Sequence, residues 1–170
     1  KGSVLNMAKV ALLASVGRTK VKVFDAPKVA ILSTGNEVKD PGMKKGESDV
    51  WNSSRTMLTF ALRSMHIEPR YLGIAKDEMK QVSKKIKGGL VYDVLIITGA
   101  VSVGEFDLIP AALKKMGISP IFHKVCVKPG KPLLFARRGS RLIFGLPGNP
   151  VSSMVSFFLF VKPALLKMLG

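Results

Sequence analysis

The sequence predicts an α/β fold with a mostly parallel sheet and helices on both of its faces. Two continuous apolar runs, at 29–32 and 94–97, have the character of strands buried on both faces. Segments with helical periodicity follow each run, and this alternation of strand and helix favours a parallel sheet. Gly-containing loops follow the strands. In such sheets ligands bind beyond the carboxyl ends of the strands, so we expect a site at that edge.

The first 27 residues differ in character from the rest. A short helix is expected at 8–16, where Gly17 ends it, and alternation of apolar and polar residues predicts a strand at 20–24 before Pro27. We expect 1–27 to be the end of a preceding domain or a linker, and 28–170 to form the α/β domain.

The remaining elements are predicted from caps and periodicity. Ser53 or Ser54 is expected to begin a helix, Asp77 and Asp107 are expected to cap two more, and a hairpin is expected about Arg138-Gly139. A last helix is expected from 151 to 168, with a kink or break at Pro163. The residues expected to face the core from the first three helices are Met57, Phe60, Ala61 and Met65; Met79, Val82 and Ile86; and Ile109, Leu113 and Met116.

The composition excludes several classes of protein. The chain has 170 residues, which fits one domain, and its single cysteine, Cys126, excludes a disulfide scaffold. A reducing cytoplasm is therefore the expected compartment. The longest apolar stretch, 154–161, is shorter than the roughly 20 residues that span a bilayer, so we expect a buried helix and no membrane partner.

A formal net charge of +16 attracts anions. Three explanations remain open: a lysine-rich solvated surface, an anionic small-molecule ligand, or nucleic acid. The Lys and Arg residues are scattered, and no alternation of aromatic and basic residues suggests base stacking. Nucleic acid is therefore not the expected partner.

The loop 98–107 combines features of an anion site and of a cation site. Gly99 and Gly104 allow close backbone approach to a ligand, Ser102 offers a hydroxyl, and a helix N-terminus follows. Glu105 and Asp107 lie in the same loop, where an anion alone would be repelled. A phosphate together with Mg²⁺ explains both properties, because carboxylates hold Mg²⁺ and the metal bridges to phosphate oxygens. Helix capping accounts for Asp107 alone.

Two further loops contain prolines and potential anion ligands. Lys128 and Lys131 lie in a Lys-Pro-Gly-Lys-Pro segment, four residues after Lys124, where a rigid backbone can present positive charge to phosphate. A solvated turn is the alternative. The loop 146–150 leads into a helix whose first turn contains Ser152. Glu37 follows a predicted strand as an ordinary surface acid would, and Trp51 is expected to pack in the core rather than over a ligand.

Four motifs together resemble the MoeA family, which includes the C-terminal domain of gephyrin. They are Leu32-Ser33-Thr34-Gly35-Asn36-Glu37 and the segments 98–107, 128–132 and 145–152, and the resemblance covers about 13–170. It implies a three-layer α/β/α fold of the MogA type. It also implies that adenylylated molybdopterin and molybdate are substrates, that molybdate is inserted into the pterin, and that AMP is released.

The resemblance assigns roles position by position. Glu37, Asp77 and Asp107 match the acids expected to be catalytic and to bind the metal. The implied substrate-binding residues are Thr34, Gly35, Asn52, Ser53, Arg55, Gly99, Ser102, Gly104, Glu105, Lys124, Lys128, Lys131, Pro147, Gly148, Asn149, Pro150 and Ser152. The chain departs from the family at Asn52, where an aspartate is usual, and at Ala100, where a second glycine is usual.

The resemblance also implies partners. MoeA proteins contain further domains and form dimers, so we expect a homodimer, or a trimer if the chain is of the MogA type, and ligand binding without turnover when this chain is alone. Three alternative functions stay open: adenylyl transfer to molybdopterin by a MogA-like enzyme, a non-catalytic molybdopterin-binding or scaffold domain, and nucleic-acid binding through charge alone.

Overall fold

The central sheet of the computed structural model is mostly parallel, as predicted. The structure describes residues 2–99 and 108–170, and the strands of this sheet are β1 (Val29–Thr34), β4 (Arg70–Ala75), β5 (Val94–Gly99), β6 (Pro120–His123), β7 (Leu134–Arg138) and β8 (Arg141–Pro147). Their spatial order is β4-β1-β5-β8-β7-β6. The first four run parallel, and β7 is antiparallel to both of its neighbours. The predicted strands β1 and β5 are adjacent, interior and parallel, with Val29 opposite Val94.

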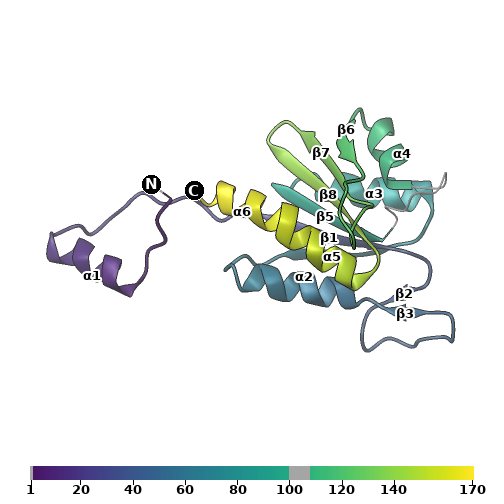
Figure 1. Ribbon diagram of the computed structural model, residues 1–170, viewed down its shortest axis with the longest axis horizontal. Coiled ribbons are helices and arrows are strands. Elements are labelled where there is room, and N and C mark those ends of the chain that lie inside the picture. Colours follow the sequence, from purple (N-terminus) through teal and green to yellow (C-terminus); the bar gives the residue numbers. More distant parts are fainter. Residues whose placement is uncertain (1, 100–107) are drawn as a thin grey trace.

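Helices cover both faces of this sheet and complete three layers (Figure 1). The helices are α1 (Met7–Ser15), α2 (Ser53–Arg63), α3 (Met79–Gly89), α4 (Leu108–Lys115), α5 (Pro150–Ser156), the π-helical η1 (Phe157–Val161) and α6 (Lys162–Met168). Core residues of α2, η1 and α6 pack on one face, and those of α3 and α4 on the other.

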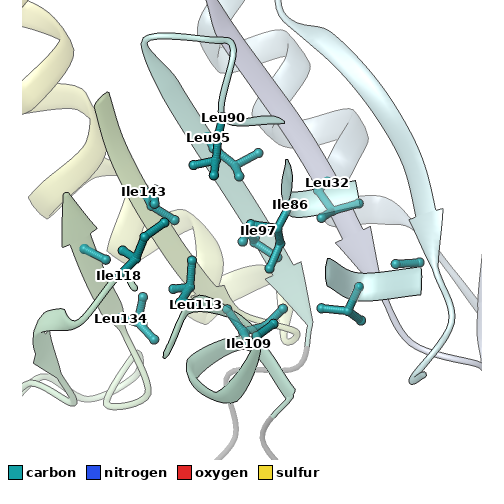
Figure 2. Packing of buried hydrophobic residues seen from close by; sticks show 14 of the residues in the cluster. Leu32, Ile86, Leu90, Leu95, Ile97, Ile109, Leu113, Ile118, Leu134 and Ile143 are labelled. Carbon is teal, nitrogen blue, oxygen red and sulfur yellow. The ribbon is translucent and has the colours of Figure 1, made fainter. Parts of the chain in front are cut away.

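Alternate side chains of β1 enter the two cores. Ala30 and Leu32 point into the core under α3 and α4, and Val29 and Ile31 point into the core under α2 and η1. Figure 2 shows Leu32 and Ile97 beside Ile86 of α3, and Ile109 of α4 belongs to the same cluster. This burial on both faces explains why β1 and β5 read as continuous apolar runs.

The N-terminal segment is only partly as predicted. The expected helix is present as α1, and Figure 1 shows it standing apart from the α/β body. None of the α1 residues that the structure describes is buried. The predicted strand at 20–24 is wrong: this stretch is irregular, and Val21, Val23 and Phe24 are exposed. Alternation stabilises a strand only where a neighbouring strand pairs with it, and no pairing partner lies beside 20–24 in the described structure.

Two helix beginnings differ from the prediction. Asn52, not a serine, caps α2, and the buried face contains Leu58 and Leu62, whereas Phe60 is 75% exposed. The predicted Met57, Ala61 and Met65 are partly buried against the same core, so Phe60 alone is wrong among the residues expected to face it. Asp77 does not cap α3, whose N-cap position is Glu78.

The C-terminal helix continues without a break from Pro150 to Met168. Pro163 has no N–H to donate, and the π-helical turn η1 precedes it in place of the predicted kink. With 19 residues and a mean hydropathy of 1.5, the whole helix has the length and composition of a membrane span, although the apolar stretch at 154–161 within it is shorter. One face of the helix, with Phe157, Val161 and Leu165, is buried against the sheet, whereas Phe158, Leu159 and Leu166 are about half exposed.

Candidate functional site

A pocket of about 390 Å³ opens at the carboxyl edge of the sheet, where the sequence predicts the site. Its wall combines the ends of β1 and β5, the start of α2, the loop after β8, and a two-stranded sheet of β2 (Val38–Lys39) and β3 (Val50–Trp51). The residues that line it are Ser33, Thr34, Glu37, Val38, Val50, Trp51, Asn52, Ser53, Ser54, Thr98, Gly99, Gly148 and Pro150.

The floor of the pocket depends on close backbone approach. Gly99 has φ +113°, and a Cβ there would collide with the carbonyl oxygen of Thr34. A Cβ on Gly148 would lie 3.6 Å from the Cα of Gly99, so the loop after β8 lies close to the end of β5. The Thr34 hydroxyl donates to the carbonyl of Thr98 over 3.0 Å and holds the two strand ends together.

Asn52 is the centre of a polar network in the pocket wall. Its side chain is almost completely buried, and its Oδ1 accepts from the backbone N–H of Arg55 over 3.2 Å, which caps α2. Its Nδ2 lies 2.9 Å from Asp40 Oδ1, 3.0 Å from the Tyr71 hydroxyl and 3.0 Å from Ser33 Oγ. These contacts join β1, β4 and the helix start, so the network fixes the shape of the pocket.

Arg55 and Asp40 contact the same tyrosine. The Arg55 guanidinium lies 4.5 Å from the centre of the Tyr71 ring, and the Tyr71 hydroxyl donates to Asp40 over 3.1 Å. The buried Nε of Arg55 has no hydrogen-bond partner within the part of the chain that the structure describes. Asp40 therefore brings a carboxylate to the network that surrounds Asn52.

Burial raises the pKa of Tyr71 from 10.0 to about 12; a hydrogen bond with Ser33 opposes this shift, and the charge of Asp40 adds to it. The folded protein therefore holds the phenolic proton more tightly than the unfolded chain does.

As the pH rises from about 10 to about 12, the free energy of unfolding is expected to fall, because the unfolded state loses the proton of Tyr71 first. Urea denaturation of wild type and Tyr71→Phe across this range checks it: the variant should show a shallower alkaline decline. Equal slopes would contradict the assignment.

Two of the three predicted acids lie on loops that contact each other. Glu37 is exposed and lines the pocket. The backbone N–H of Asn36 donates to Asp77 Oδ2 over 3.2 Å, and the N–H of Asp77 donates to Asn36 Oδ1 over 3.1 Å. This reciprocal pair holds the loop after β4 against the loop after β1, and it explains why Asp77 does not cap α3.

Other predicted residues lie elsewhere. The predicted residues that do not line the pocket in the described structure are Gly35, Arg55, Asp77, Lys124, Lys128, Lys131, Pro147, Asn149 and Ser152. Asn149 caps α5 by accepting from the N–H groups of Val151 and Ser152. The loop 128–132 packs on α5, where a Cβ on Gly130 would lie 3.2 Å from Ser156 Oγ. Ser102, Gly104, Glu105 and Asp107 lie outside the described residues.

Sequence reasoning missed several pocket residues. Ser33 and Thr98 are buried polar residues one position before the ends of β1 and β5, and their place at the ligand edge was the available signal. Asp40 and Tyr71, which join the network around Asn52 without lining the pocket, carried no local signal. Trp51, expected in the core, is 45% exposed and lines the pocket. Cys126 is exposed.

Comparison with known proteins identifies the domain. A family described as "Probable molybdopterin binding domain" matches residues 30–167. The molybdopterin molybdenumtransferase of Haemophilus influenzae is 36% identical over 171 residues, which cover 100% of this chain and 42% of that protein. The enzyme of the same name from Bacillus subtilis is 36% identical over 166 residues, which cover 97% of this chain and 39% of that protein.

Solved structures agree with this assignment. The molybdopterin biosynthesis MoeA protein from Pyrococcus horikosii has a TM-score of 0.86 and 34% identity, over 100% of this chain and 42% of that one. A molybdenum cofactor biosynthesis protein B, at 15% identity and a TM-score of 0.58, shares the fold alone. The chain therefore spans less than half the length of the MoeA-type relatives. Because the family match includes every strand end that forms the pocket, the chain belongs to the family of probable molybdopterin binding domains, and its resemblance to MoeA is confirmed.

Proposed function

We propose that this chain binds adenylylated molybdopterin and promotes the insertion of molybdate with release of AMP, as the corresponding domain of a molybdopterin molybdenumtransferase. The observation that carries the proposal is the pocket at the carboxyl edge of β1 and β5, beside the N-terminus of α2. The names of the relatives that align with the whole chain support the same reaction.

The pocket suits a phosphorylated ligand. Ser53 is the first residue of α2 and lines the pocket, so the N-terminal turn of this helix faces it with the positive end of the helix dipole. Gly99 and Gly148 leave backbone accessible beside it. The net charge of +16 increases the rate of encounter with an anionic substrate.

A divalent cation, Mg²⁺, fits the acids near this anion site. The Asn36–Asp77 pair keeps the loops of Glu37 and Asp77 together, and carboxylates gathered beside a phosphate repel it unless a cation lies between them. No group of three or more His, Cys, Asp or Glu side chains suited to a metal occurs among residues 2–99 and 108–170. We therefore infer that Asp107 or phosphate oxygens complete the ligand set. A Mg²⁺ ion bound there would neutralise part of the phosphate charge.

Assembly with further domains belongs to the same proposal. Relatives more than twice as long contain this domain, and the exposed apolar residues of 2–24, among them Met7, Leu12 and Val23, provide a surface for such a neighbour. We propose a homodimer as the working assembly and the cytoplasm as its compartment, in keeping with the single exposed cysteine.

Product analysis tests the function. The chain together with the remaining MoeA domains is incubated with adenylylated molybdopterin, Mg²⁺ and molybdate, and AMP is quantified by chromatography. AMP release that requires molybdate is the expected result, and omission of molybdate is the control. Formation of adenylylated molybdopterin from molybdopterin and ATP, without molybdate-dependent AMP release, would instead assign the adenylyl-transfer step. Ligand binding with neither reaction would assign a scaffold role.

A further inference from the structure

An exposed indole forms part of the pocket wall. Trp51 is 45% exposed, and its neighbour Val50 is 50% exposed, yet both line the pocket. Tryptophan buries a large apolar surface when it can, so an exposed indole inside a concave site indicates a surface that a ligand covers.

The backbone holds Trp51 in place from both sides. The N–H of Val50 donates to the carbonyl of Glu37 over 2.8 Å, and the N–H of Asn52 donates to the carbonyl of Lys39 over 2.8 Å. The buried side chain of Asn52 anchors the next position. Because these bonds fix the backbone around it, the indole is presented to the pocket by a preorganised strand rather than by a free loop.

The same pocket has room for a ring. Gly99 and Gly148 contribute backbone to its wall without side chains that would fill it. The volume of about 390 Å³ falls within the range of small-molecule sites. The pocket therefore combines the N-terminus of α2, which suits a phosphate, with the indole of Trp51 in its wall.

We propose that Trp51 stacks on a planar heteroaromatic ring of the bound ligand and selects ring-bearing phosphates over ringless ones. The ring is adenine or pterin, since both have the extended π-face that an indole recognises. This inference rests on the proposed function and deepens it by naming the residue that recognises the ring. The opposing view is that Trp51 only stabilises the β2–β3 sheet.

Fluorescence of the 170-residue chain provides a direct measurement, because Trp51 is its only tryptophan. The probes are adenosine 5′-monophosphate, a pterin-6-ylmethyl phosphate and the ringless ribose 5-phosphate, with affinities measured in parallel by calorimetry. At least one ring-bearing probe is expected to quench the indole emission at saturation, and ribose 5-phosphate is expected to bind without quenching. The probe that quenches identifies the ring.

Substitutions separate stacking from a structural role. Trp51→Leu is expected to weaken binding of the quenching probe about tenfold, equivalent to about 1.4 kcal/mol, and to leave ribose 5-phosphate within about twofold. Trp51→Phe retains a ring and should stay within about threefold for both probes. Phe60→Leu removes an aromatic side chain that is 75% exposed and does not line the pocket, so it is the matched control and should change neither affinity.

The outcomes distinguish this inference from the proposed function. Equal weakening of ring-bearing and ringless probes by Trp51→Leu, or no weakening of either, would overturn the stacking role while ligand binding itself stands. Binding of no probe by the wild-type chain would remove the proposed function and the stacking role together.

Discussion

Replacing Glu37 by glutamine is expected to lower molybdate-dependent AMP release at least about 100-fold, the low end of what a positioned acid or base contributes. Glu37 lines the pocket beside the loop that holds Asp77, and glutamine keeps its shape but removes the negative charge that would bind Mg²⁺. Because the side chain is exposed, the melting temperature should not change measurably. The measurement is AMP release across a range of Mg²⁺ concentrations, together with thermal denaturation.

Asp107→Asn is the companion change. Asparagine caps helices about as well as aspartate, so folding should be retained while Mg²⁺-dependent release is lost. The control is Glu47→Gln, the same substitution at an exposed acid of the β2–β3 loop that does not line the pocket. Unchanged release by the Asp107 variant would leave that residue a helix cap. Unchanged release by the Glu37 variant would remove the pocket acid from the reaction.

Asn52→Ala is expected to destabilise the fold by about 3 kcal/mol. The change removes the cap of α2, which contributes about 1 kcal/mol, and deprives Asp40, Tyr71 and Ser33 of a buried partner, which costs about 1–3 kcal/mol more. For a chain of this size the melting temperature should fall by about 6–12 °C. Urea denaturation measures the free energy directly.

The matched control for this change is Asn149→Ala. Asn149 caps α5 through two backbone N–H groups, but it is exposed and joins no buried network. Its loss should cost only about 1 kcal/mol. Equal destabilisation by the two substitutions would show that Asn52 acts as a cap alone, and that the network in the pocket wall contributes no stability of its own.

The sequence by itself determined the sheet and the edge at which the pocket lies. The runs at 29–32 and 94–97 indicate strands that are buried on both faces. This burial is visible in the sequence of one strand alone, because every residue in the run is apolar. Gly35 after β1 and Gly99 at the end of β5 marked the ligand edge in the same way, because backbone freedom is a property of the residue itself. The four-motif resemblance to MoeA added the family, since order and spacing along the chain are visible in sequence.

Only the tertiary structure decided which side chains meet at that edge. Asn52 reaches Ser33 across 19 residues, Tyr71 reaches Asp40 across 31, and Asp77 reaches Asn36 across 41. Local patterns could assign Asp77 to a helix cap and Trp51 to the core, because both assignments need only neighbouring residues. Their actual places depend on contacts between distant segments. These contacts, not local propensity, anchor Asn52 at the start of α2, place Trp51 in the pocket wall and join the loops of Glu37 and Asp77.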